Sequence, residues 1–229
     1  MERRGFIKFC AASVAALQAR ELAAEARAQL YARARLVDEK GAPLRASSIP
    51  VNRNFIFHYP FAATPCFLLN LGIAVKPAKL KTLAGESYEW NGGVGAARSV
   101  VAYSAICAHK LSYPTRDISF ISFRTEKSAR NRIANVIHCC SEHSQYDPAE
   151  GARVVAGPAP QPLAAILLEH DTNSDEIHAV GTLGGEMFKE FFDRFSFKLQ
   201  LEHGVPRASV SGSCVVQELD NYCNQQVKC

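Results

Sequence analysis

The residues most able to do chemistry are two cysteines and two histidines that lie in two short segments. Cys107 and His109 are separated by one residue, and Cys140 and His143 by two residues. Thiolate sulfur and imidazole nitrogen are ligands for both iron and zinc. In a zinc finger the cysteine pair and the histidine pair come from separate segments. Here each segment supplies one ligand of each kind, which favours two metal ions over a single tetrahedral zinc.

The two segments resemble the cluster-binding loops of Rieske [2Fe–2S] proteins, in which C-x-H is followed by C-x-x-H, a Tyr-Asp pair and a Gly-Pro-Ala-Pro loop. The resemblance covers roughly residues 60–201. It implies a mostly β, antiparallel domain with both loops at one end, and a [2Fe–2S] cluster as cofactor. It also implies that Cys107, His109, Cys140 and His143 hold the metals. The matching segments are Cys107-Ala108-His109, Cys140-Ser141-Glu142-His143, Tyr146-Asp147 and Gly157-Pro158-Ala159-Pro160.

The loops depart from the family pattern in having no cysteine pair to join them. Many quinol-oxidising members carry one extra cysteine in each loop, and the two form a disulfide. The matching positions here are Ser112 and Glu142. We therefore expect packing, hydrogen bonds or the Gly-Pro-Ala-Pro loop to hold the two loops, and a reduction potential below that of the quinol-oxidising relatives.

A second departure concerns the spacing after the second histidine. The family tyrosine follows the ligand histidine by four residues, whereas Tyr146 follows His143 by three. Counting back from Tyr146 would make Cys139 the ligand and place Glu142 in the histidine position. Counting by C-x-x-H selects Cys140. We prefer Cys140, because glutamate is a poor substitute for imidazole on this cluster, and Cys139 stays as the alternative.

The resemblance also indicates how the site is tuned. Hydrogen bonds to the cluster sulfurs raise its potential, because they stabilise the added electron. Ser144 and Tyr146 are the candidate donors. We expect His109 and His143 to lie at an exposed tip, where an electron donor or acceptor can approach them.

The N-terminus has the pattern of an export signal. Arg3-Arg4-Gly5-Phe6-Ile7-Lys8 resembles the twin-arginine consensus, and a short apolar stretch follows over residues 9–17. That stretch is well below the roughly 20 residues needed to span a bilayer. Cleavage near Ala28 is expected, and the alternative is an amphipathic helix that is never removed. The signal predicts a periplasmic protein, with membrane association only through this N-terminal segment.

The remaining chain predicts the elements that must position the loops. It has 229 residues with 48% apolar and 21% charged residues, which fits one globular domain, and its net charge of +4 comes with no basic run that would indicate nucleic-acid binding. Strands at 99–106 and 133–138 should lead into the two loops, and a hairpin is expected at 163–182. We predict four parts: the signal (1–28), an N-terminal extension (29–58), the cluster domain (59–201) and a C-terminal extension (202–229).

One helix interrupts the β pattern near the C-terminus. Phe188, Phe191, Phe192 and Phe195 recur at three- and four-residue spacing, which places them on one helical face over residues 186–197. Packing of this face onto the β domain is the main interpretation, and a docking surface for a partner subunit is the alternative.

Three cysteines of the C-terminal extension, Cys214, Cys223 and Cys229, could form disulfide bonds. Once Cys10 of the signal and two ligands are set aside, an odd number remains, and pairing cannot be read from sequence alone. A Cys214–Cys223 or Cys223–Cys229 bond in the tail is one interpretation. Cys66 could also take part.

The resemblance to Rieske proteins implies one-electron transfer without bond-making by protein groups. The first hypothesis is a periplasmic electron-transfer subunit of a larger oxidoreductase, similar to the small subunit of arsenite oxidase, rather than a catalyst by itself. Its partners would be a larger catalytic or cytochrome subunit and a soluble acceptor such as cytochrome c. The alternatives are the Rieske subunit of a cytochrome bc-type complex and a structural β domain that has lost the cluster.

Overall fold

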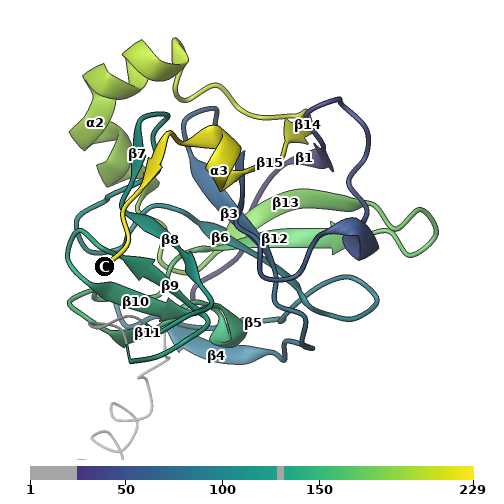
Figure 1. Ribbon diagram of the computed structural model, residues 1–229, viewed down its shortest axis with the longest axis horizontal. Helices are drawn as coiled ribbons and strands as arrows, with labels where there is room; N and C mark the ends of the chain where they lie inside the picture. Colours follow the sequence, from purple (N-terminus) through teal and green to yellow (C-terminus); the bar gives the residue numbers. More distant parts are fainter. Residues whose placement is uncertain (1–24, 128–131) are drawn as a thin grey trace, which may run out of the picture.

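The computed structural model describes residues 25–127 and 132–229. Most of the segment predicted to be an export signal therefore lies outside the described residues. The architecture is mostly β, as predicted, with strands arranged in two main sheets and a helix at one end (Figure 1).

The larger sheet has eight strands in the order β14-β1-β13-β12-β6-β3-β2-β15. Its neighbours pair antiparallel, except that β14 runs parallel to β1. Its strands are β1 (Gln29–Val37), β2 (Phe55–His58), β3 (Pro65–Asn70), β6 (Val100–Ser104), β12 (Ala165–His170), β13 (Ile177–Leu183), β14 (Gly212–Val215) and β15 (Gln217–Glu218).

The smaller sheet has four antiparallel strands in the order β11-β10-β9-β8. They are β8 (Ile121–Arg124), β9 (Val136–Cys139), β10 (Ser144–Asp147) and β11 (Arg153–Ala156). Two short pairs complete the strands: β4 (Ala78–Lys81) with β5 (Ser87–Trp90), and β7 (Ile118–Ser119) with β16 (Gln225–Gln226). The helices are η1 (Ala46–Ser48), η2 (Pro148–Glu150), α2 (Phe188–His203) and α3 (Leu219–Tyr222).

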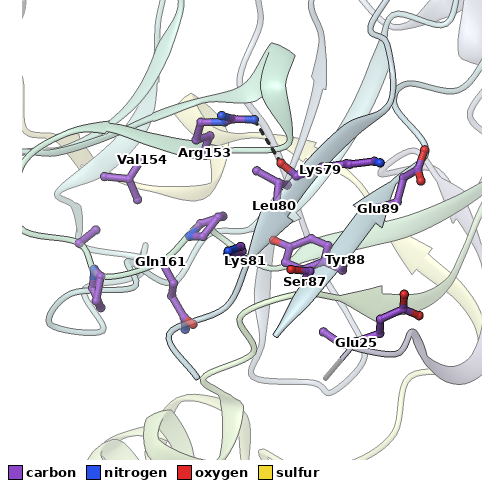
Figure 2. A pocket seen from close by; sticks show the side chains of 14 residues that line it. Glu25, Lys79, Leu80, Lys81, Ser87, Tyr88, Glu89, Arg153, Val154 and Gln161 are labelled. Atoms are coloured by element: carbon purple, nitrogen blue, oxygen red, sulfur yellow. Dashed lines mark hydrogen bonds between the residues drawn. The ribbon is translucent and has the colours of Figure 1, made fainter. Parts of the chain in front are cut away.

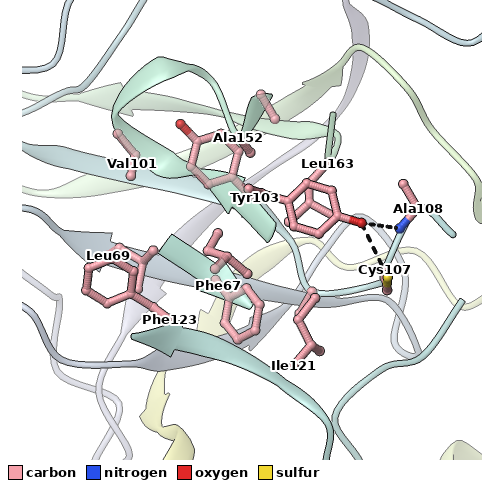
Figure 3. Packing of buried hydrophobic residues seen from close by; sticks show 14 of the residues in the cluster. Phe67, Leu69, Val101, Tyr103, Cys107, Ala108, Ile121, Phe123, Ala152 and Leu163 are labelled. Atoms are coloured by element: carbon pink, nitrogen blue, oxygen red, sulfur yellow. Dashed lines mark hydrogen bonds between the residues drawn. The ribbon is translucent and has the colours of Figure 1, made fainter. Parts of the chain in front are cut away.

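Alternation along the strands divides the core in two. On β3, Phe67 and Leu69 belong to a cluster that also contains Ile121 and Ile137 of the smaller sheet. Cys66 and Leu68, which alternate with them on the same strand, belong to a second cluster on the other face of the larger sheet. Successive side chains of a strand point to opposite faces. The first cluster therefore joins the two sheets, and Figure 3 shows that it reaches Cys107.

The segments predicted as N- and C-terminal extensions both supply strands to the larger sheet. β1 and β2 come from residues 29–58, and β14 and β15 come from residues 202–229. β1 was not predicted, because its sequence is mixed and charged. Its Arg33 and Arg35 lie beside Glu169 and Glu176, with nitrogen–oxygen distances of 3.0 and 3.3 Å. The charged side chains thus stay at the surface while the backbone completes the sheet.

The phenylalanine face of α2 packs inward. Phe188, Phe191 and Phe192 are buried, and Phe195 packs against the same cluster, so core packing was the correct interpretation of their spacing. The helix extends to His203, beyond the predicted end at 197. Phe197 and Leu201 lie on its outer face and are 75% and 72% exposed.

Candidate metal centre

The two predicted ligand loops follow strands of different sheets. Loop 1, residues 107–113, follows β6 of the larger sheet, and loop 2, residues 140–143, joins β9 to β10 of the smaller sheet. Both delivering strands were predicted. Since the first core cluster lies between these sheets, side chains that point inward from the two loops meet there.

Loop 1 is a tight turn fixed by its own backbone. The N–H of Cys107 donates to the Ser112 carbonyl at 2.8 Å, and the N–H of Leu111 donates to the Cys107 carbonyl at 3.0 Å. Leu111 has a φ of +60°, a left-handed conformation that is uncommon outside glycine, and its side chain is fully buried. Its burial among the α2 phenylalanines holds this conformation in place.

In loop 2 the structure differs from the preferred ligand assignment. The Sγ atom of Cys140 is bonded to Cys229, so it is not a thiolate that could hold a metal. Cys139 is fully buried, and its sulfur is hydrogen-bonded to that of Cys107. The alternative ligand, Cys139, is therefore the one that the structure brings to Cys107.

Strand geometry explains this correction. In a strand, residues two apart share a face and their intermediate neighbour points the other way. His138 and Cys140 both meet Cys229: the sulfur of Cys229 lies 3.6 Å from the ring nitrogens of His138. Cys139 therefore points to the opposite face, toward the core. A count based on the C-x-x-H spacing does not show that a strand ends at Cys139, so it cannot tell which of the two cysteines faces the core.

Each of the two sulfurs is surrounded by hydrogen-bond donors. The N–H groups of His109 and Lys110 point to the sulfur of Cys107, and those of Ser141 and Glu142 point to the sulfur of Cys139. These amides were not identified from the sequence, because every residue type except proline supplies a backbone N–H. Hydrogen bonds of this kind stabilise negative charge on sulfur.

The two thiols share a proton unequally. The pKa of Cys107 is lowered to about 6, chiefly because Cys139 donates a hydrogen bond to it, and the Tyr146 hydroxyl acts in the same direction. The pKa of Cys139 is raised, because that thiol is the donor and is buried. A metal centre that takes both sulfurs must displace this shared proton.

Tyr146 occupies the position predicted for a tuning residue. Its hydroxyl accepts a hydrogen bond from the N–H of Ala108 at 3.1 Å and lies 3.3 Å from the sulfur of Cys107; Figure 3 draws both as dashed lines. Because a thiolate has no proton to give, the hydroxyl donates to Cys107 once that sulfur is ionised. Burial and the charge on Cys107 raise the pKa of Tyr146, which keeps the hydroxyl protonated.

Ser144, the other predicted tuning residue, lies directly opposite Cys139 in the β9–β10 pair, and opposed residues share a face. Its Oγ atom is buried and has no hydrogen-bond partner among the described residues. Buried polar groups nearly always have partners, so this hydroxyl is placed to donate to an acceptor next to Cys139.

His109 fits a metal centre by the same criterion, and His143 resembles it in the burial of one ring nitrogen. His109 and His143 are each partly exposed, yet the Nδ1 atom of each is buried. The Nδ1 of His109 has no hydrogen-bond partner in the part of the chain that the structure describes. Both rings thus present Nδ1 to the interior. Together with two adjacent thiols, they make the mixed sulfur and nitrogen donor set of a Rieske [2Fe–2S] centre.

The Gly-Pro-Ala-Pro loop, residues 157–160, closes over loop 2. Gly157 has a φ of +85°, and a Cβ placed there would lie 2.4 Å from the carbonyl oxygen of His143 and 2.6 Å from the Cα of Ser144. Only glycine allows this approach of two backbones. The contact supports the expectation that this loop helps to hold the site.

A groove of about 800 Å³ borders the other side of this loop, between β4, β5 and β11 (Figure 2). Lys79, Lys81, Glu89 and Arg153 give it mixed charge, and Arg153 donates to the carbonyl of Lys79 at 3.2 Å. The sulfurs of Cys107 and Cys139 do not line it.

The tail is cross-linked, but not as predicted. Cys229 pairs with Cys140 of loop 2 instead of Cys223, and Cys214 does not pair with Cys223. Among the described residues Cys66, Cys214 and Cys223 are free and buried. The preference for Cys140 as the metal ligand left Cys139, and not the true partner of Cys229, among the cysteines considered for pairing.

No protein-family model matches the chain. The iodate reductase subunit IdrB of Pseudomonas sp. (strain SCT) is 25% identical over 185 residues, which are 80% of this chain and 80% of that protein. Among solved structures, the soluble domain of the Rieske protein II (soxF) from Sulfolobus acidocaldarius is 24% identical, with a TM-score of 0.49, covering 78% of this chain and 85% of that one.

Both loop motifs converge on Cys107 and Cys139, and the tyrosine and the glycine–proline loop take the places that the resemblance implies. In its two loop motifs and its mostly β architecture the chain resembles the Rieske-type iron–sulfur proteins, a family whose cofactor is a [2Fe–2S] cluster.

Proposed function

We propose that the protein transfers single electrons through a [2Fe–2S] cluster held by Cys107, Cys139, His109 and His143. The observation that carries this proposal is the meeting of the two thiols under the Tyr146 hydroxyl, with one inward-facing histidine in each loop. The cluster, when bound, takes up one electron and gives it back.

The residues of this chain set the conditions for that exchange. The amides of loops 1 and 2, with Tyr146 and Ser144, offer hydrogen bonds that favour added negative charge. The partial exposure of His109 and His143 gives a partner a short path to the site. Burial of both cysteines keeps water from their sulfurs.

We infer that the chain works as a subunit of a larger oxidoreductase. Support comes from the relative described as a subunit of iodate reductase, which aligns with this chain over most of both lengths. A groove of about 520 Å³ between the two loops and α2 is lined by Lys110, Arg194 and Lys198, with Glu142 as its acidic residue. This excess of positive charge suits an acidic surface on a catalytic subunit or on an acceptor such as a cytochrome c.

Export by the twin-arginine route to the periplasm is the location that we propose. The Arg3-Arg4 motif supports it, as does a disulfide, which persists in oxidising compartments. β1 begins at Gln29, directly after the expected cleavage near Ala28, so cleavage there leaves the sheet complete. Within the described residues, no helix is long and apolar enough to cross a membrane.

Fractionation of cells tests the location. The wild-type chain is expected in the periplasmic fraction, and the variant with Arg3→Lys and Arg4→Lys in the cytoplasm. Recovery of the wild type with membranes after a high-salt wash would instead favour the cytochrome bc-type alternative.

Electron paramagnetic resonance of the dithionite-reduced protein tests the cluster and its ligands. We expect a rhombic signal typical of mixed nitrogen and sulfur ligation, its loss in Cys139→Ser and its retention in Cys140→Ser. The reverse pattern in the two variants would contradict the ligand assignment. A wild-type protein without iron would contradict the proposed function and leave a structural β domain.

A further inference from the structure

The C-terminal segment runs from one metal-binding loop to the other. Loop 1 continues into residues 116–119, and the tail lies alongside them: the N–H groups of Asn224 and Val227 donate to the carbonyls of Arg116 and Ser119, each at 2.8 Å. β16 pairs with β7 in this stretch. In Figure 1 the yellow tail passes β7 and ends near β9 and β10. The chain therefore reaches loop 2 while held beside the exit of loop 1.

At loop 2 the tail is attached covalently. Cys229 is bonded to Cys140, which directly follows the proposed ligand Cys139. The N–H of Cys140 also donates to the carbonyl of Phe120, at 2.6 Å, between β7 and β8. The same residue is thus fixed by its backbone and by its side chain.

The C-terminal segment is anchored in the core where it begins, at residues 219–223, so its position is fixed. Leu219, Tyr222 and Cys223 belong to the core cluster between the two sheets. The guanidinium of Arg116 lies over the Tyr222 ring, 4.3 Å from its centroid, and the N–H of Leu219 donates to the carbonyl of Asn54 at 2.8 Å. A disulfide to a mobile tail would constrain nothing, whereas this one ties loop 2 to the core and to the segment after loop 1.

We propose that the Cys140–Cys229 disulfide clamps the C-terminal tail across the two loops, and that both cysteines are positioning residues for the cluster. The clamp takes the place of a direct disulfide between the loops, which Ser112 and Glu142 cannot form. This proposal rests on the proposed function for its redox readouts. The clamp opens when a dithiol such as dithiothreitol donates two electrons and two protons: the S–S bond breaks, two thiols form and the reductant closes to its own disulfide.

Single and double substitutions test the clamp. Cys229→Ser, Cys140→Ser and the double variant are compared with the wild type, and Lys228→Ser serves as a tail control that keeps the disulfide. The readouts are the rate of cluster loss on warming, the midpoint potential and the shape of the paramagnetic resonance signal. Peptide mapping without reductant establishes the disulfide in the wild type.

We expect each single variant to assemble a cluster and lose it on the order of tenfold faster than the wild type, as is typical when the support of metal ligands is removed. The double variant should lose the cluster at the same rate as the single variants, because all three lack the same disulfide. Shifted signals in these variants, with a wild-type signal in Lys228→Ser, would indicate altered positioning of the ligands and not a general loss of stability.

Three results would overturn the clamp: single variants that behave as wild type, loss of the cluster in Cys140→Ser but not in Cys229→Ser, or free thiols with a metal ion held by His138, Cys140 and Cys229, whose ligand atoms lie within 4.8 Å of one another. If the wild type holds no cluster, the proposed function fails by itself. Hydrogen exchange of the loop 2 amides then decides on the clamp, which predicts faster exchange in Cys229→Ser.

Discussion

At the scale of single residues, the two core-facing cysteines are distinguished by what surrounds their sulfurs. Cys107 receives backbone N–H groups and lies beside the Tyr146 hydroxyl, whereas Cys139 receives backbone N–H groups and faces the buried hydroxyl of Ser144. All of these groups are donors toward an ionised sulfur or an acceptor beside it. The site is therefore built to stabilise added negative charge before any partner arrives.

Tyr146→Phe should lower the midpoint potential of the cluster. A hydrogen bond to a charged acceptor contributes about 1.5–3 kcal/mol. If about 1 kcal/mol of this depends on the added electron, the potential falls by about 40 mV, since 59 mV corresponds to about 1.4 kcal/mol for one electron. Tyr103→Phe is the matched control, because its hydroxyl donates to the Pro148 carbonyl at 2.7 Å in the same core and leaves Cys107 untouched. Equal potentials for both variants in a redox titration would contradict this role for Tyr146.

The sequence indicated which residue types form the site, but it did not show in which direction each side chain points. The resemblance to Rieske proteins pointed to Cys107, His109, His143, Ser144 and Tyr146, and the structure places these residues in or beside the two loops. The choice between Cys139 and Cys140 depended on which face of β9 each side chain occupies, and a count of residues through an irregular loop does not contain that information. The partner of Cys229 lies 89 residues away in the sequence. Its identity also depends on which face of β9 the Cys140 side chain occupies, so it could not be predicted.

At the scale of elements, α2 supports loop 1. The Phe191 ring is fully buried and meets the Tyr113 ring edge-on, with centroids 4.9 Å apart. Leu111 of the same loop belongs to this cluster. The helix was predicted because apolar residues at helical spacing are a strong local signal. β10 was not predicted, because its polar sequence Ser-Gln-Tyr-Asp is buried by tertiary contacts that local preference does not record.

Phe191→Ala should destabilise the protein and loosen loop 1. Removing a buried phenylalanine side chain costs about 3–5 kcal/mol. Phe197→Ala on the same helix is the control, because that ring is 75% exposed and should change stability by no more than about 0.5 kcal/mol. Denaturant unfolding measures both variants, and hydrogen exchange at Lys110 and Leu111 reports on the loop. Slow exchange there in Phe191→Ala would show that the helix does not position loop 1.

At the scale of the whole molecule, the fold unites segments from both ends of the described chain. β1 and β14 lie side by side at one edge of the larger sheet, and β15 lies at the opposite edge. The predicted extensions thus complete the scaffold that carries loop 1.

The stability of the folded protein should depend on pH, because the packing of the fold buries histidine side chains. Burial is the main cause of a lowered pKa in four histidines: His58, His138, His178 and His203.

Acidification should therefore weaken the folded protein, and His58 allows a direct test. Burial lowers its pKa to about 3, and the positive charges of His203 and Arg116 act in the same direction. Below about pH 6.5 the His58 side chain binds a proton in the unfolded chain, whereas in the folded protein it stays neutral until about pH 3. The contribution of neutral His58 to the free energy of unfolding is therefore fully present above about pH 6.5 and is lost as the pH falls. For this one histidine we expect a loss of about 1–2 kcal/mol between pH 7 and pH 5. Urea unfolding at the two pH values should show a loss smaller by that amount in His58→Gln. An unchanged pH dependence in this variant would mean that His58 is protonated within the folded protein. The rings of His203 and Tyr222, whose centroids lie 5.4 and 5.7 Å from that of His58, would then not exclude its charge.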